Sequence, residues 1–312
     1  MERCWSLDEV VRDDRSIVTV GTFDGVHVGH LSIFKFLVEQ AERRDCKPVV
    51  VTFDPHPRRV VHEDPVPLLT TPGERAEVCA ASGIQRFIVL PFDRDLASMG
   101  PSDFVTRILV ERIGLRAIVV GYDHAFGRGR TGNHDLLTEL GARHGFDVDV
   151  IPPAAVGDQV VSSSALRRLL AEAGDVKHAA HLLGRRYTLG GSVVSGAQRG
   201  RQLGFPTANV VPTDDRKLIP SIGVYAIRIQ VDGEAQAFGG MMNIGRRPTF
   251  EETVVHLEAH LFDFYGDLYG RQVRVEFVDR MRSERKFHTV DALIAQLRED
   301  EARCRAVLRA VS

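Results

Sequence analysis

Cysteine and long apolar runs are scarce in this chain of 312 residues. The four cysteines, Cys4, Cys46, Cys79 and Cys304, form no Cys-x-x-Cys pair, which argues against a disulfide scaffold or a structural zinc site. No apolar run approaches the roughly 20 residues that cross a bilayer. Residues 1–15 are studded with charges and do not resemble a signal peptide. We therefore expect free thiols in a cytoplasmic protein that has no membrane partner.

A strong charge of either sign is also absent. The 40 Lys and Arg residues are balanced by 42 Asp and Glu residues, so the net charge is −2 and gives no reason to expect a nucleic-acid partner. We find neither an internal repeat nor a low-complexity tract. Apolar residues make up 44% of the chain, and its length suits two domains of ordinary size.

In the first half, short apolar segments alternate with amphipathic ones. Strands are expected at 16–20, 48–53, 87–90, 117–120 and 148–151, and helices at 31–39, 71–81, 101–112 and 134–144. Thr71, Pro72 and Glu74 have the spacing of a capping box at the start of one of these helices. The pattern predicts an α/β domain with a parallel sheet covered on both faces, in which ligands bind beyond the carboxyl ends of the strands.

Residues 21–30, Gly-Thr-Phe-Asp-Gly-Val-His-Val-Gly-His, lie between the first expected strand and the first helix. The free N–H groups at a helix N-terminus can bind phosphate, and the glycines of residues 21–30 allow the backbone to come close to a ligand. His27 and His30 can donate hydrogen bonds to phosphate oxygens as negative charge develops in a transition state. The alternatives are a metal pair or the start of a surface helix, but a metal site needs three or four ligands and only Asp24 is near.

Polar loops follow other expected strands at 54–58, 91–95 and 121–130. The last of these loops mixes glycines with arginines and could close over a triphosphate. At 161–168, three serines and Arg167 stand at the start of a helix, where hydroxyls, N–H groups and a guanidinium can hold an anion. Polar turns and plain helix capping are the alternatives for these segments.

Beyond residues 184–186 the periodicity changes. Strand-like segments at 187–189, 192–194, 223–231, 254–264 and 273–278 predict a mainly antiparallel β-barrel. We place the domain boundary between residues 184 and 185, which gives domains 1–184 and 185–312. An amphipathic helix at 289–308 is expected to pack on the barrel and to do no chemistry.

Two patterns in the second half carry chemistry. Residues 196–210 are rich in glycine but do not form a Walker A loop. Thr207 and Asn209 are two residues apart, so in an extended segment they face the same way and offer a hydroxyl and an amide oxygen to Mg²⁺. A glycine-rich hairpin turn is the alternative. His256, Glu258 and His260 share one face of an alternating strand, which fits either a metal site or a general base at Glu258.

The first half resembles the adenylyltransferase half of prokaryotic bifunctional riboflavin kinase/FAD synthetases, which belong to the Rossmann-like HxGH nucleotidyltransferases. It carries GTFDGVHxGH at 21–30 and segments similar to TFDPHP at 52–57, LPFD at 90–93, VGxDFxFG at 119–127 and ISSTxIR at 161–167. His124 and Ser164 depart from the usual Phe and Thr. The resemblance implies catalysis by His27 and His30, ATP binding by Gly21, Phe23, Asp24, Gly29, Ser163, Ser164 and Arg167, and flavin binding by Phe53, Pro57 and Asp123.

The second half is similar to riboflavin kinase. It carries GRxLGFPTAN at 200–209, GVYA at 223–226, NIGxRPTF at 243–250, LExHLxDFxGDLYG at 257–270 and RxERKF at 282–287, with Ala259 in place of the common Val. The resemblance implies ATP binding by Gly200, Gly204, Pro206, Thr207 and Asn209, with Mg²⁺ at Thr207 and Asn209. It also implies that Glu258 takes the proton of the ribityl 5′-hydroxyl and that Arg282 and Phe287 bind flavin.

The resemblance therefore implies two reactions, riboflavin plus ATP to FMN, and FMN plus ATP to FAD and pyrophosphate. The expected partners are riboflavin, FMN and ATP, with Mg²⁺ accompanying the nucleotide. Two alternatives remain open, an HxGH nucleotidyltransferase that acts on another small phosphate ester and a non-catalytic flavin-binding regulator. The sequence carries no signal for an oligomeric state.

Overall fold

The computed structural model describes residues 1–121, 126–151, 155–156, 159–195, 203–248 and 253–311. The chain divides into two compact units, residues 1–163 and 164–312. Each unit is described by itself below.

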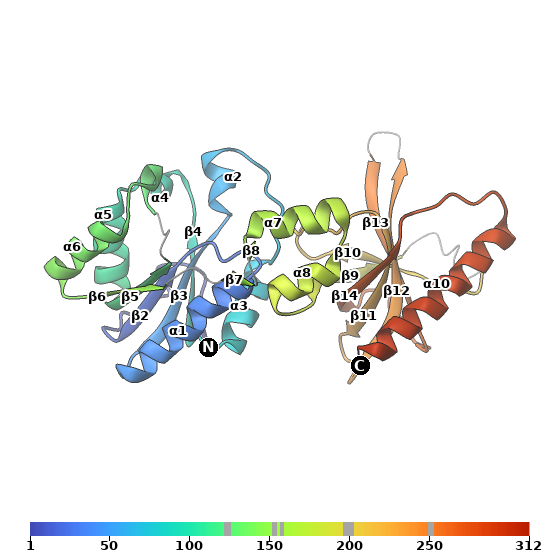
Figure 1. Cartoon of the computed structure of the whole chain (residues 1–312), viewed down its shortest axis with the longest axis horizontal. Coiled ribbons are helices and arrows are strands. Elements are labelled where there is room, and N and C mark those ends of the chain that lie inside the picture. Colours follow the sequence, from blue (N-terminus) through green and yellow to red (C-terminus); the bar gives the residue numbers. More distant parts are fainter. Residues whose placement is uncertain (122–125, 152–154, 157–158, 196–202, 249–252, 312) are drawn as a thin grey trace. The chain divides into compact units, whose positions relative to one another are not determined.

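The first unit is built on a six-stranded parallel sheet with the strand order β1-β4-β3-β2-β5-β6 (Figure 1). Its strands are β1 (Glu2–Cys4), β2 (Ser16–Val20), β3 (Lys47–Asp54), β4 (Arg86–Pro91), β5 (Leu115–Gly121) and β6 (Asp147–Ile151). The predicted parallel sheet is confirmed. The short edge strand β1 was not expected, because its three residues lie in the charged N-terminal segment.

Helices cover both faces of this sheet because successive strand residues point to opposite sides. Ile17, Val50 and Val119 pack on one face with α1 (Val28–Arg43) and α3 (Pro72–Ala81). The residues that follow each of them pack on the other face with the π-helical segment η1 (Phe104–Ile113) and with α6 (His134–His144). The remaining elements of this unit are α2 (Pro57–Val61), α4 (Arg94–Ser98), α5 (Pro101–Asp103), η2 (Arg128–Arg130), β7 (Ala155–Val156) and β8 (Gln159–Val160).

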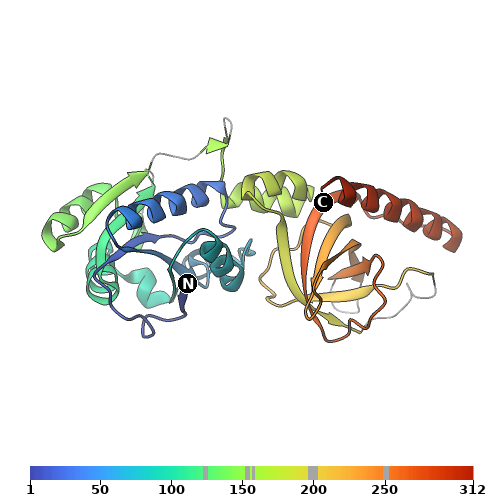
Figure 2. The same ribbon diagram turned by 90° about the horizontal axis from the view of Figure 1, so that it is seen from below.

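The second unit contains a closed antiparallel barrel with the strand order β10-β13-β12-β11-β14-β9. Its strands are β9 (Tyr187–Val194), β10 (Ala208–Pro212), β11 (Gly223–Val231), β12 (Ala237–Pro248), β13 (Thr253–Leu261) and β14 (Gln272–Arg282). The predicted barrel and C-terminal helix are confirmed. The helix is α10 (Val290–Ala310), which begins after the N-cap Thr289 and lies alongside the barrel strands (Figure 2).

Three helical segments precede the barrel, α7 (Ser163–Arg168), η3 (Leu169–Ala173) and α8 (Val176–Leu183). Apart from Ser163, they belong to the second compact unit, although the sequence placed its domain boundary after residue 184. The assignment of one activity to residues 1–184 and the other to 185–312 stays a prediction.

The cysteines of both units are free. Cys4, Cys79 and Cys304 are buried, and Cys46 is partly exposed. Burial, and after it the charge of Asp300, raises the pKa of the Cys304 thiol to about 12. This thiol therefore stays protonated at neutral pH and contributes to packing rather than to chemistry.

A substitution at Gly174 measures how tightly the second unit is packed around this residue. It ends η3 with φ +64°, and a Cβ placed there would collide with Ser221, Tyr225 and Arg280. Gly270 has φ +76° and open space around it. We expect Gly174→Ala to lower the free energy of unfolding by about 3 kcal/mol, because overpacking adds to the strain of a left-handed Ala. Gly270→Ala should cost about 1 kcal/mol from the strain alone. Urea unfolding followed by circular dichroism measures both, and equal losses would contradict the steric argument.

Candidate active sites

The first candidate site is the turn that joins β2 to α1. The helix α1 begins at Val28, three residues before the expected start, so His27 is its N-cap and His30 lies in its first turn. This first turn contains no acidic residue. The positive end of the helix therefore favours an anion.

The two histidines of this turn form one stacked unit. The ring centroids of His27 and His30 are 3.7 Å apart, and the ring planes are 18° apart. The buried Phe23 ring meets His30 edge-on at 5.1 Å and also packs against Phe34 of α1. An aromatic ring anchored in the core therefore supports the imidazole pair from behind.

Gly21 and Gly29 leave room for these rings. A Cβ on Gly21 would lie 2.9 Å from the Phe23 ring, and a Cβ on Gly29 would lie 3.2 Å from the His27 ring. The sequence attributed the glycines to the approach of a ligand, whereas here both spaces face side chains of the turn itself. Their predicted ATP contacts stay predictions.

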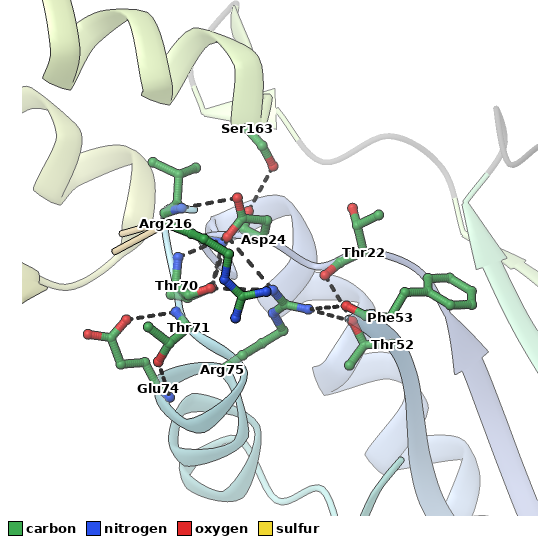
Figure 3. Close-up of polar contacts among 12 residues, drawn as sticks. Thr22, Asp24, Thr52, Phe53, Thr70, Thr71, Glu74, Arg75, Ser163 and Arg216 are labelled. Carbon is green, nitrogen blue, oxygen red and sulfur yellow. Dashed lines mark hydrogen bonds and ion pairs between the residues drawn. The ribbon is translucent and has the colours of Figure 1, made fainter. Parts of the chain in front are cut away.

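Asp24 points into the protein (Figure 3). The side chain has no exposed surface, and its carboxylate accepts hydrogen bonds from the backbone N–H groups of Leu69 and Thr70. Its main-chain carbonyl accepts a hydrogen bond of 2.8 Å from the Ser163 hydroxyl. The observed partners of Asp24 are thus groups of the chain itself, a role that the sequence did not predict. ATP binding by Asp24 and Ser163 stays a prediction.

The other predicted residues of this site lie on different elements. Ser164 is exposed on α7 and Arg167 is partly exposed there, both within the second unit. Phe53 stands near the carboxyl end of β3, with its ring edge-on to Phe92 at 5.4 Å, and Pro57 opens α2. Asp123 and His124 lie outside the described residues.

The second candidate site is a cavity of about 360 Å³ in the barrel unit. Glu258 on β13 lines it, together with Thr207 and with Asn243 on β12. The strand register places Glu258 directly opposite Asn209 on β10 and opposite Asn243 on its other side. Opposed residues project from the same face of a sheet, so the carboxylate lies between two amide side chains. Sequence reasoning missed Asn243 because its partner strand could not be assigned from the alternating pattern alone.

The segment leading to Thr207 is held by His260. The Nδ1 of His260 donates a hydrogen bond of 2.7 Å to the carbonyl of Pro206, and the ring meets Phe205 edge-on. Because a carbonyl only accepts, this nitrogen carries a proton. Among the described residues, no group of three or more His, Cys, Asp and Glu residues is arranged to hold a metal ion. The contacts therefore give no support to a histidine metal site on β13. Gly204 and Pro206 border this segment, and Gly200 lies outside the described residues.

The helix α10 forms one wall of the cavity, contributed by Leu293, Leu297 and Asp300. Asp300 is fully buried and accepts hydrogen bonds from the Arg282 guanidinium at 2.6 to 3.0 Å and from the Gln296 amide at 3.0 Å. The sequence expected this helix only to pack on the barrel, but it also anchors a cavity residue. The spacing of apolar residues along the helix does not show that Asp300 contacts Arg282.

Arg282 and Phe287, the predicted flavin-binding residues, both line the cavity. The guanidinium of Arg282 lies 5.9 Å from the centre of the Phe287 ring. Flavin binding by the pair stays a prediction.

The pairing of Arg282 with Asp300 can be measured by a double-mutant cycle. Arg282→Met should cost about 3 kcal/mol of unfolding free energy, because it leaves a buried carboxylate without its cation. Adding Asp300→Leu should recover most of that loss, since removing both charges is close to neutral. Urea unfolding of the two single variants and the double variant gives the coupling. Simple additivity of the two losses would contradict a coupled pair.

Comparisons with known proteins find a different family model in each half of the chain. Residues 10–165 match the family model of FAD synthetase, and residues 183–308 match that of riboflavin kinase. A bifunctional riboflavin kinase/FMN adenylyltransferase of Pseudomonas fluorescens is 38% identical over 292 residues, which cover 93% of this chain and 92% of the relative. Those of Escherichia coli and Listeria monocytogenes are 36% and 34% identical, over 93% and 94% of this chain and 91% and 93% of the relatives.

A solved structure also matches nearly the whole chain. It is described as a macrolide-efflux protein from Streptococcus pneumoniae and superimposes with a TM-score of 0.89 at 30% identity, covering 97% of this chain and 98% of that one. Within the part of this chain that the structure describes, no helix has the length and apolar character needed to traverse a bilayer. The two family matches and the full-length relatives agree, and the chain belongs to the family of bifunctional riboflavin kinase/FMN adenylyltransferases.

Proposed function

We propose that this chain makes FAD in two steps, phosphorylating riboflavin to FMN in its barrel unit and adenylylating FMN in its parallel-sheet unit. One observation carries the proposal: each half of the chain matches its own family model, and each half contains its own cluster of polar residues suited to phosphate chemistry. The substrates are riboflavin, FMN and ATP. Transfer to another phosphate ester and non-catalytic flavin binding are not favoured, because neither accounts for both family matches.

In the barrel, Glu258 acts as the general base. Its carboxylate takes the proton of the riboflavin 5′-hydroxyl, the freed oxygen attacks the γ-phosphorus of ATP, and ADP leaves. The position of Glu258 in the cavity between Asn209 and Asn243 supports this role, because neighbouring amides can hold a carboxylate in one orientation. Arg282 and Phe287, which line the same cavity, bind the flavin.

Thr207 and Asn209 fit a magnesium ion. Their hydroxyl and amide carbonyl are hard oxygen donors, Thr207 lines the cavity, and Asn209 stands opposite Glu258. A bound Mg²⁺ supplies neutralisation of phosphate charge. Gly200, Gly204 and Pro206 would hold the ATP beside them.

In the parallel-sheet unit, the FMN phosphate attacks the α-phosphorus of ATP and pyrophosphate leaves. His27 and His30 donate hydrogen bonds to the phosphate oxygens as charge builds up on them, a role supported by their place at the N-terminus of α1. Gly21, Phe23, Asp24 and Gly29 shape the nucleotide pocket. The pyrophosphate is bound by Ser163, Ser164 and Arg167, and the flavin is bound by Phe53, Pro57 and Asp123.

Separate sites predict separable activities. Glu258→Gln should lower FMN formation by roughly 10²- to 10⁴-fold, because the base is lost, and should leave FAD formation from supplied FMN unchanged. His30→Ala should do the reverse, with a loss of roughly 10²-fold in FAD formation. Chromatography of products from riboflavin plus ATP and from FMN plus ATP measures both activities. Loss of both activities in either variant would contradict separate sites, and the absence of FMN and FAD with the unmodified protein would end the proposal.

The magnesium assignment has its own test. Thr207→Val removes one oxygen donor and should raise the Mg²⁺ concentration for half-maximal FMN formation by about 10-fold, equivalent to about 1.4 kcal/mol. FAD formation should keep its dependence on Mg²⁺. Thr213→Val is the control, because Thr213 follows β10 and does not line the cavity. An unchanged Mg²⁺ requirement in Thr207→Val would contradict the assignment.

A further inference from the structure

The turn before α1 has an unfavourable backbone. Phe23 and Val26 have φ values of 45° and 40°, and Gly25 between them has φ 87°. Residues other than glycine rarely adopt positive φ, and a β-branched residue such as Val26 does so least readily. Such a conformation persists only where the surroundings impose it. The turn that carries His27 therefore depends on contacts from outside itself.

Thr70, 45 residues beyond Gly25 in the chain, supplies two of those contacts with one hydroxyl. Its Oγ1 accepts a hydrogen bond of 2.9 Å from the Gly25 N–H and donates one of 3.2 Å to the Asp24 carboxylate. The Thr70 N–H donates to the same carboxylate oxygen at 2.8 Å (Figure 3). Thr70 is 5% exposed and Asp24 is 0% exposed, so water does not offer a ready substitute.

Arg75 extends this network to the other side of the turn. Its buried guanidinium donates to the Thr52 hydroxyl at 2.7 Å and to the Thr70 carbonyl at 3.3 Å, and it lies 3.9 Å from the Asp24 carboxylate. The Thr52 hydroxyl in turn donates to the Thr22 carbonyl at 2.9 Å. Residues 22, 24 and 25 are thus each tied to a buried side chain of another segment.

We propose that Thr70 is a positioning residue for adenylyl transfer, acting through Asp24 and Gly25 to hold the strained turn that carries His27 and His30. Thr52 and Arg75 complete the same clamp from the side of Thr22. None of the three carries out the chemistry itself. The inference rests on the proposed adenylyltransferase activity of the first unit and adds the residues that keep its donors aligned. Catalytic groups that are displaced by about 1 Å can lose roughly 10² in rate, so loss of the clamp should be visible in kcat.

Thr70→Val and Thr70→Ser separate the hydroxyl from the shape of the side chain. Thr70→Val keeps the volume and removes both hydroxyl contacts, so kcat for FAD formation from FMN should fall by roughly 10²-fold while KM for ATP changes by less than about threefold. Thr70→Ser keeps the hydroxyl and should retain most of the rate. FMN formation by the barrel unit, measured on the same samples, should be unchanged and serves as an internal reference for the amount of protein. Circular dichroism and the melting temperature of the same samples show whether the parallel-sheet unit is folded.

Thr71→Val is the matched control. The Thr71 hydroxyl caps α3 by accepting the Glu74 N–H at 3.2 Å, and the Glu74 carboxylate accepts the Thr71 N–H at 2.9 Å, so both of these hydrogen bonds lie within the start of α3. This variant should lower the melting temperature and keep kcat for FAD formation within about twofold, because capping affects stability. A loss of kcat in Thr71→Val equal to that in Thr70→Val would overturn the proposal, because the rate would then follow stability alone.

Further outcomes also decide the matter. Equal kcat in Thr70→Val and in the unmodified protein would overturn the inference, while the proposed function would stand because the unmodified protein makes FAD. Should Thr70→Val fail to fold, Thr52→Val removes the other hydroxyl of the network and should also lower kcat more than KM. A Thr52→Val protein with full kcat would then count against the clamp.

Discussion

A buried carboxylate in each unit holds a segment of the candidate site to the rest of the protein. A carboxylate without exposed surface is costly unless hydrogen bonds and a nearby cation replace its water. Asp24 obtains these from the backbone of Leu69 and Thr70, from the Thr70 hydroxyl and from Arg75 at 3.9 Å. The turn before α1 and the start of α3 are therefore joined by one network of contacts, although 45 residues separate Asp24 from Leu69 in the chain.

The barrel unit also contains a buried carboxylate that hydrogen bonds and a cation stabilise, but there it holds a helix instead of a turn. Asp300 is also fully buried, and Arg282 and Gln296 satisfy it. Here the carboxylate belongs to α10 and the cation to β14, so the pair fixes a helix to the wall of the cavity rather than fixing a turn. In both units the charged contact sets where a loop or helix stands, and apolar packing supplies the bulk of the stability.

Local sequence patterns predicted much of this fold, but they could not predict contacts between residues that are distant in the chain. The apolar runs around Val18 and Val50 identified the parallel strands because strands covered on both faces need apolar residues at every position. The capping box of Thr71 and Glu74 was predicted and is confirmed, since both partners lie within one turn. The burial of Asp24 and Asp300 could not be predicted. A sequence does not distinguish a buried aspartate from a solvated one, because the cation beside it lies far away in the chain. The order of the strands was missed for the same reason, whereas the edge strand β1 was missed because its three residues lie in the charged N-terminal segment.

The glycines of the first site have two possible physical explanations, space for a ligand and space for the aromatic rings of the turn itself. A requirement for small residues beside His27 and His30 suggests a ligand that comes close, yet the spaces at Gly21 and Gly29 face the rings of Phe23 and His27. A larger residue at either position would push an imidazole or its supporting ring out of place. Donors that are already aligned need no reorganisation when charge develops on a phosphate, and this prior alignment is where much of electrostatic catalysis arises. In the proposed adenylyl transfer, the glycines would act through the order of the histidine pair, and the strain of the turn is the cost of that order.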